Sequence, residues 1–153
     1  MSKEHARRLE NPTTDSILPG TLLLTLKAAG LYFAIVFGTG FALGTLRVLF
    51  LLPRFGVRWA ELIEMPFMFI AIVLGARLTV RRFKLHASPL VSIATGVIAL
   101  CLVLLMECSV VLWLRGMTFS DYLAGRDPVS GTVYYLMLLL FAATPWFTAR
   151  FPD

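Results

Sequence analysis

Long apolar stretches constrain this chain more than any other feature of its sequence. Four of them are each about the length that a helix needs to cross the ~30 Å hydrocarbon core of a bilayer. The chain has 153 residues and is 58% hydrophobic, above the share typical of soluble domains. We therefore expect an all-α integral membrane bundle of four transmembrane helices, preceded by a polar cytoplasmic tail at 1–16 and formed by 17–153 as one domain. The expected spans are residues 28–52, 60–80, 90–114 and 129–147.

Proline and glycine mark the expected helix boundaries. Pro53 and Gly56 predict the end of the first span. A helix-capping residue followed by proline predicts the starts of the last two spans, at Ser88-Pro89 and Asp127-Pro128. The apolar sequence before the first span is too long for one perpendicular helix, so residues 17–26 are expected at the interface. The short loops predict that consecutive helices pack antiparallel.

The basic residues indicate an orientation. Cytoplasmic loops of membrane proteins carry an excess of Lys and Arg, so the richer side should face the cytoplasm, with both termini inside. Trp59 and Trp146 fall at opposite interfaces, as in an aromatic belt. The richer side holds Lys3, Arg7, Arg8, Lys27, Arg77, Arg81, Arg82, Lys84 and Arg150, and the other side holds Arg47, Arg54, Arg58, Arg115 and Arg126.

Three ionisable residues fall inside the apolar stretches: Arg47, Glu64 and Glu107. Counting from the helix ends, all three lie about 8–9 Å below the outer interface, so we expect a buried charge cluster in one layer. One interpretation is a proton or cation relay, or an anchor for a polar substrate group. The structural interpretation is an ion pair that fixes helix register, with the spare carboxyl protonated or solvated. A third is that a partner protein supplies the counter-charge.

Two prolines lie within the spans and predict helix kinks at Pro66 and Pro145. Each proline lacks an N–H, which leaves the carbonyl of Leu62 or Phe141 without its helical donor. The carbonyl freed by Pro66 would lie near Glu64 and could serve as a cation or water ligand. A kink without a ligand is the more common outcome for proline in a membrane helix.

Glu61 and Glu64 share one helical face. Two carboxylates rarely suffice to bind a divalent ion, so we expect no metal site. Glu61 is instead expected to pair with Arg58 or Arg54 at the interface.

Small residues recur at intervals of four along the first span. Such stripes let helix backbones approach closely, within a chain, between copies or with another protein. We expect an internal partner for one stripe and leave the other open. The helix-packing residues are Gly30, Ala34, Gly38 and Ala42 on one face, and Gly40 and Gly44 on the neighbouring face.

The basic turn after the second span is expected to contact lipid headgroups. Arg77 should extend its charge toward the interface, one turn before Arg81. With Arg82 and Lys84 they form a basic rim suited to anionic lipid.

Motifs of catalysis are absent from the sequence. It holds no HExxH, GxSxG, P-loop or Gly-rich dinucleotide turn. Its histidines, His5 and His86, fall outside the spans, so neither can serve as a base or haem ligand within them. We expect no enzymatic activity and no cofactor.

Three segments resemble a family of small bacterial four-span inner-membrane proteins that is itself uncharacterised. They are RVLFLLPRFG (47–56), AELIEMP (60–66) and YLAGRDPVSGTVY (122–134). The resemblance implies a multi-pass protein of the bacterial inner (plasma) membrane and carries no activity or ligand with it.

Together these observations favour a non-enzymatic accessory or assembly subunit of a membrane complex. Its partners would be the lipid bilayer and other membrane subunits or a second copy of itself, with no role for nucleic acid. The alternative is a small oligomeric transporter of protons, cations or solute that uses Glu64 and Glu107.

Overall fold

The computed structural model describes residues 19–109, 120 and 127–151, and all the regular structure in this part of the chain is helical. It thus confirms the all-α class. Within the described residues, three helices are long and apolar enough to cross a membrane: Gly20–Phe83, Pro89–Ser109 and Pro128–Arg150. The count differs from the expected four because the first two expected spans belong to one continuous helical segment.

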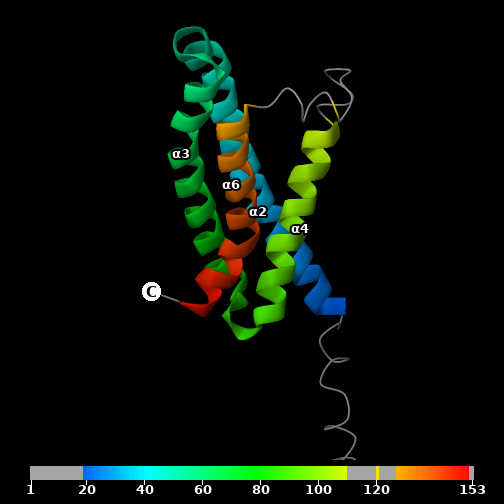
Figure 1. The fold of residues 1–153 in the computed structure, drawn as a ribbon. Coiled ribbons are helices and arrows are strands. Elements are labelled where there is room, and N and C mark those ends of the chain that lie inside the picture. The colour runs from blue at the N-terminus through cyan, green and yellow to red at the C-terminus, as the bar shows by residue number, and fades with distance from the viewer. Residues whose placement is uncertain (1–18, 110–119, 121–126, 152–153) are drawn as a thin grey trace, which may run out of the picture.

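That segment folds back on itself. It consists of α2 (Pro19–Leu46), a five-residue π-helix η2 (Arg47–Leu51) and α3 (Leu52–Phe83). The reversal occurs at Gly56, whose φ of 76° and ψ of 173° lie outside the helical region and suit a residue without Cβ. As a result α2 and α3 lie side by side (Figure 1).

The expected helix end at Pro53 was wrong, whereas the break expected at Gly56 is present. Helix α2 already begins at Pro19, so the residues assigned to the interface from position 19 onward are helical. Pro53 lies in the first turn of α3 and does not end a helix. Proline is tolerated there because the first N–H groups of a helix have no partner within it.

Two prolines do mark helix starts as expected. Helix α4 (Pro89–Ser109) begins directly after Ser88, and α6 (Pro128–Arg150) begins after Asp127. The Asp127 carboxylate accepts hydrogen bonds from the backbone N–H groups of Val129 and Ser130, both at 3.1 Å, which caps the helix. Residues 1–16 and 110–114, which the sequence assigns to the tail and to the end of the third span, lie outside the described residues.

The four long helices form a ring in the order α2, α3, α6, α4 (Figure 1). Helices α3 and α4 therefore lie across the bundle from each other, although they are consecutive in the chain. This corrects the expectation that all consecutive helices are packed neighbours. The connection through Lys84, with φ 52°, and the short 3₁₀ helix η3 (Leu85–Ala87) carries the chain across the end of the bundle, and α6 takes the place beside α3.

The core lies where the four helices meet. Its buried members are Ala29, Tyr32, Val36, Ile72, Ala76, Ala99 and Phe141. Tyr32 of α2 reaches across the diagonal to α6: its hydroxyl donates a hydrogen bond to the Phe141 carbonyl at 2.9 Å, and the two rings stack with centroids 4.5 Å apart. Pro145, four residues after Phe141, cannot donate to that carbonyl. The carbonyl that proline frees is therefore satisfied by a tyrosine.

Two glycines outside the predicted stripes lie at close approaches between helices. A Cβ on Gly96 of α4 would lie 2.0 Å from the Ala142 carbonyl oxygen of α6. A Cβ on Gly75 of α3 would lie 3.3 Å from side-chain atoms of Ile35 and Val36 on α2. The contact at Gly96 is with the backbone of α6 and the one at Gly75 is with side chains of α2, and both favour a small residue.

The two predicted small-residue stripes on α2 have different surroundings. A Cβ added at Gly30, Gly38 or Gly44 would meet nothing within 4 Å, and Ala34 and Ala42 are exposed, so the first stripe faces outward. On the second stripe, a Cβ on Gly40 would lie 3.3 Å from the methyl carbon of Met68 on α3.

Candidate buried-charge site

Arg47 lies between two carboxylates of α3. It is the first residue of η2, and its Nη1 atom is 3.5 Å from Oε1 of Glu61 and 3.3 Å from Oε2 of Glu64. Positions 47 and 61–64 are brought opposite each other because the chain reverses at Gly56. The side chains of Arg47, Glu61 and Glu64 are 30%, 19% and 12% exposed. We call these three residues the acidic cluster.

The acidic cluster carries more negative than positive charge when all three groups are ionised. Oε2 of Glu64 is buried and has no hydrogen-bond partner, although Arg47 lies within ion-pair distance of it. Its interaction with Arg47 is thus one of charge rather than of directed hydrogen bonding. A single guanidinium shared by two carboxylates leaves acceptor positions that a proton or a small cation could occupy.

The expected partner of Glu61 was wrong. Glu61 pairs with Arg47, whereas Arg58 pairs with Asp127 at the start of α6. Arg58 donates to Asp127 from both Nε, at 3.0 and 3.1 Å, and Nη2, at 2.8 Å. This bidentate pair fixes the register of α3 against α6.

Glu107 does not join the acidic cluster. Its Oε1 accepts a hydrogen bond from the Tyr134 hydroxyl, which links α4 to α6. In the part of the chain that the structure describes, Glu107 is not an ion-pair partner of Arg47. The three charges expected to form one cluster are therefore divided between two polar contacts, one on η2 and α3 and one on α4 and α6.

The two contacts nonetheless lie at similar depth. Helices α3 and α6 run in the same direction from the Arg58–Asp127 pair. Glu64 follows Arg58 by six residues and Tyr134 follows Asp127 by seven, so both lie roughly 9–10 Å along the helix axis from the pair. Tyr134 was not predicted as the partner of Glu107, because this contact depends on the Arg58–Asp127 pair and on the helix order, which the sequence does not show.

The prolines occupy different surroundings. Pro66 is exposed, two residues after Glu64, whereas Pro145 is buried beside the core. Both lie inside continuous helices, and the departure from helical geometry within α3 is at Gly56.

The basic residues gather at the opposite end of the bundle. Arg77, Arg81 and Arg82 lie in the last two turns of α3, and Lys84 caps that helix in a left-handed conformation. Nδ1 of His86 lies 2.9 Å from the Ala149 carbonyl oxygen, which joins η3 to the last turn of α6. Among the described residues, no group of three or more His, Cys, Asp or Glu side chains could hold a metal ion.

Comparison with known proteins gives no match: no family model, curated protein or solved structure is similar to this chain.

The Arg58–Asp127 pair predicts an acid-sensitive contact. Hydrogen bonds from Arg58 and from the Ser130 amide lower the pKa of the Asp127 carboxyl from 3.8 to about 2. Because the folded-state pKa is below the unfolded one, this contact stabilises the fold above about pH 4, and the stabilisation is lost as the pH falls through about 2. We expect the thermal midpoint of the wild-type protein in detergent to fall more between pH 5 and pH 2 than that of Arg58→Gln. Parallel declines would contradict the assignment.

Proposed function

We propose that this protein is a non-enzymatic subunit of a bacterial inner-membrane complex that crosses the bilayer four times with both termini in the cytoplasm. The reversal at Gly56 supports four crossings, since α2 and α3 lie antiparallel and each exceeds the ~30 Å of the hydrocarbon core at 1.5 Å per residue. The cations Arg81 and Arg82 in the last turn of α3 support the orientation with both termini in the cytoplasm.

The observation that carries the assembly role is the outward-facing stripe on α2. Gly30, Ala34, Gly38 and Ala42 repeat at the interval that permits close helix packing, yet the space above Gly30 and Gly38 is open. Within the chain, close packing is made by other glycines, at Gly40, Gly75 and Gly96. A stripe that the chain's own packing does not use is suited to a helix of another subunit.

Co-purification tests the assembly role. Gly38→Leu should abolish recovery of the associated membrane proteins in mild detergent, because the larger side chain blocks backbone approach. Cys101→Leu, which enlarges another exposed position on α4, is the matched control and should leave recovery unchanged. Equal recovery of partners with both variants would contradict the proposal.

A second candidate function is proton or cation transfer, and the acidic cluster is the observation that favours it. Glu64 combines a buried oxygen without a hydrogen bond with a guanidinium that it shares with Glu61. Against this role, the described acidic residues all lie toward one end of the bundle, and the core between α2 and α6 is filled by Tyr32 and Phe141.

Flux measurements in liposomes distinguish the two functions. We expect purified protein to show no proton or cation flux above that of protein-free vesicles. Flux that is lost in Glu64→Gln and in Glu107→Gln, but kept in the control Asp127→Asn, would replace the subunit role by a transport role.

A further inference from the structure

The described acidic residues of the bundle are confined to one end, whereas basic residues lie at both ends. In the part of the chain that the structure describes, the four acidic residues Glu61, Glu64, Glu107 and Asp127 all lie toward the Gly56 end. The opposite end holds only cations among its charged side chains within the same residues. These are Lys27, Arg77, Arg81, Arg82, Lys84 and Arg150, and we call them the basic end.

The helices hold these cations in one region. Lys27 precedes Ala28, which belongs to the small core cluster with Val80 and Leu85 that joins α2, α3 and η3. The hydrogen bond between His86 and Ala149 holds η3 against the last turn of α6, where Arg150 follows. The basic end therefore combines side chains from three helices, α2, α3 and α6.

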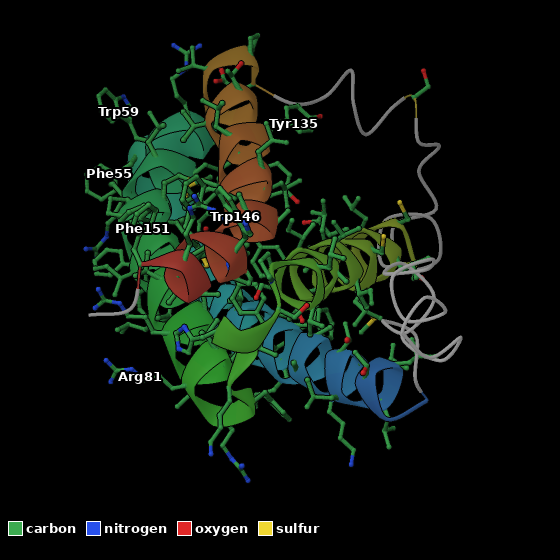
Figure 2. All side chains as sticks on the ribbon, turned by 90° about the horizontal axis from the view of Figure 1, so that it is seen from below. Phe55, Trp59, Arg81, Tyr135, Trp146 and Phe151 are labelled. Carbon is green, nitrogen blue, oxygen red and sulfur yellow. The ribbon has the colours of Figure 1, made fainter. Side chains whose placement is uncertain are left out.

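The basic end is open to its surroundings. Lys27, Arg81, Arg82, Lys84 and Arg150 are all exposed. Figure 2, which looks onto this end of the bundle, shows Arg81 extending away from α3 at the rim. Among the described residues, no carboxylate side chain lies at this end, so these five cations can attract an anion from outside the protein.

The basic end directly follows an exposed apolar surface, which is the order that a membrane protein presents at the lipid headgroups. Leu74 and Leu78, one to two turns before Arg82, are 58% and 55% exposed, so the outer face of α3 changes from apolar to basic at this level. On α6 the guanidinium carbon of Arg150 lies 5.7 Å from the ring centroid of Trp146. Trp and Arg together at the end of an apolar helix are typical of the membrane interface.

We propose that the basic end is a binding surface for anionic phospholipid headgroups of the bilayer leaflet that it faces. This inference is independent of whether the protein is a subunit or a transporter. A cation close to an anionic membrane surface contributes about fivefold to the association constant, and several of them act together. The phosphates of a bilayer are the anions that lie at the depth of these side chains.

Quenching of Trp146 by brominated lipids tests the proposal. In a Trp59→Phe/Trp113→Phe background, Trp146 reports on lipid at the basic end. We expect brominated phosphatidylglycerol to be favoured over brominated phosphatidylcholine by about fivefold or more in mixed vesicles at low salt. The triple change Arg81→Gln/Arg82→Gln/Lys84→Gln should bring the ratio close to one.

Three controls make the result decisive. The variant Arg81→Lys/Arg82→Lys/Lys84→Arg preserves the charge and should retain the preference. Trp59, as the remaining tryptophan, reports on the Gly56 end of the bundle and should show a ratio near one. A preference that is equal at Trp59 and Trp146, or that survives the triple change to Gln, would overturn the proposal. If inorganic phosphate at constant ionic strength abolished the preference for phosphatidylglycerol, that result would also overturn the proposal, in favour of a free-phosphate site.

Discussion

Replacing Gly96 with alanine is expected to destabilise the protein by about 2–3 kcal/mol, the upper part of the range for overpacked sites. The added Cβ would lie 2.0 Å from the Ala142 carbonyl oxygen and 2.9 Å from its carbonyl carbon. Both are backbone atoms, so no side-chain rotation relieves the clash, and α4 must move away from α6. The free energy of unfolding in mild detergent, measured by denaturant titration, checks this result.

Gly38→Ala is the matched control for this experiment. Gly38 is also inside a helix, but a Cβ there would meet nothing within 4 Å. Alanine is intrinsically the better helix former by about 1 kcal/mol, so the control should be neutral or slightly stabilising. If the two variants behaved alike, the close approach of α4 and α6 at Gly96 would be wrong.

The second large effect is expected from Tyr32→Phe. The variant keeps the ring that stacks on Phe141 and removes only the hydroxyl that donates to the Phe141 carbonyl. Pro145 provides no N–H to that carbonyl, so it becomes a buried acceptor without a partner. We expect a loss of about 1–3 kcal/mol in the free energy of unfolding.

A double-mutant cycle isolates the role of proline in this contact. In Pro145→Ala the restored amide can donate to the Phe141 carbonyl, as in an uninterrupted helix. Tyr32→Phe should then cost less than about 0.5 kcal/mol, so that the two changes couple by about 1 kcal/mol or more. A cost for Tyr32→Phe that is the same in both backgrounds would show that its hydroxyl acts through another group.

Local signals in the sequence were sufficient for part of the fold. The capping pairs before residues 89 and 128 gave the starts of α4 and α6, because capping depends on residues within one helical turn. Counting residues from the helix ends put Arg47, Glu64 and Glu107 in one layer, and the structure brings Arg47 and Glu64 to 3.3 Å. Antiparallel neighbours joined by a short turn allow such counting, since residues equally far from the turn must lie opposite each other.

Contacts between helices distant in sequence could not be predicted in this way. The partner of Glu107 depends on which helix lies beside α4, and that helix is α6 rather than α3. The small residues at Gly30 and Gly38 have the spacing of a packing stripe, as do Ser92 and Gly96, but only the second pair is buried against another helix. Spacing indicates that a face permits close approach, whereas the crossing of the helices decides which face is used.

The ring order has a consequence for how the chain matures. Helix α6 is the last of the four to be synthesised, yet it provides the Ala142 carbonyl beside Gly96, the acceptor for Tyr32, and the partner of Arg58. Until it inserts, α3 and α4 lack the neighbour that each of them packs against. We therefore expect a newly made chain to hold its first helices in an open arrangement, with the Tyr32 hydroxyl lacking its acceptor on α6, until α6 joins them. Fusions or truncations that delay α6 should prolong that open state and expose it to membrane proteases.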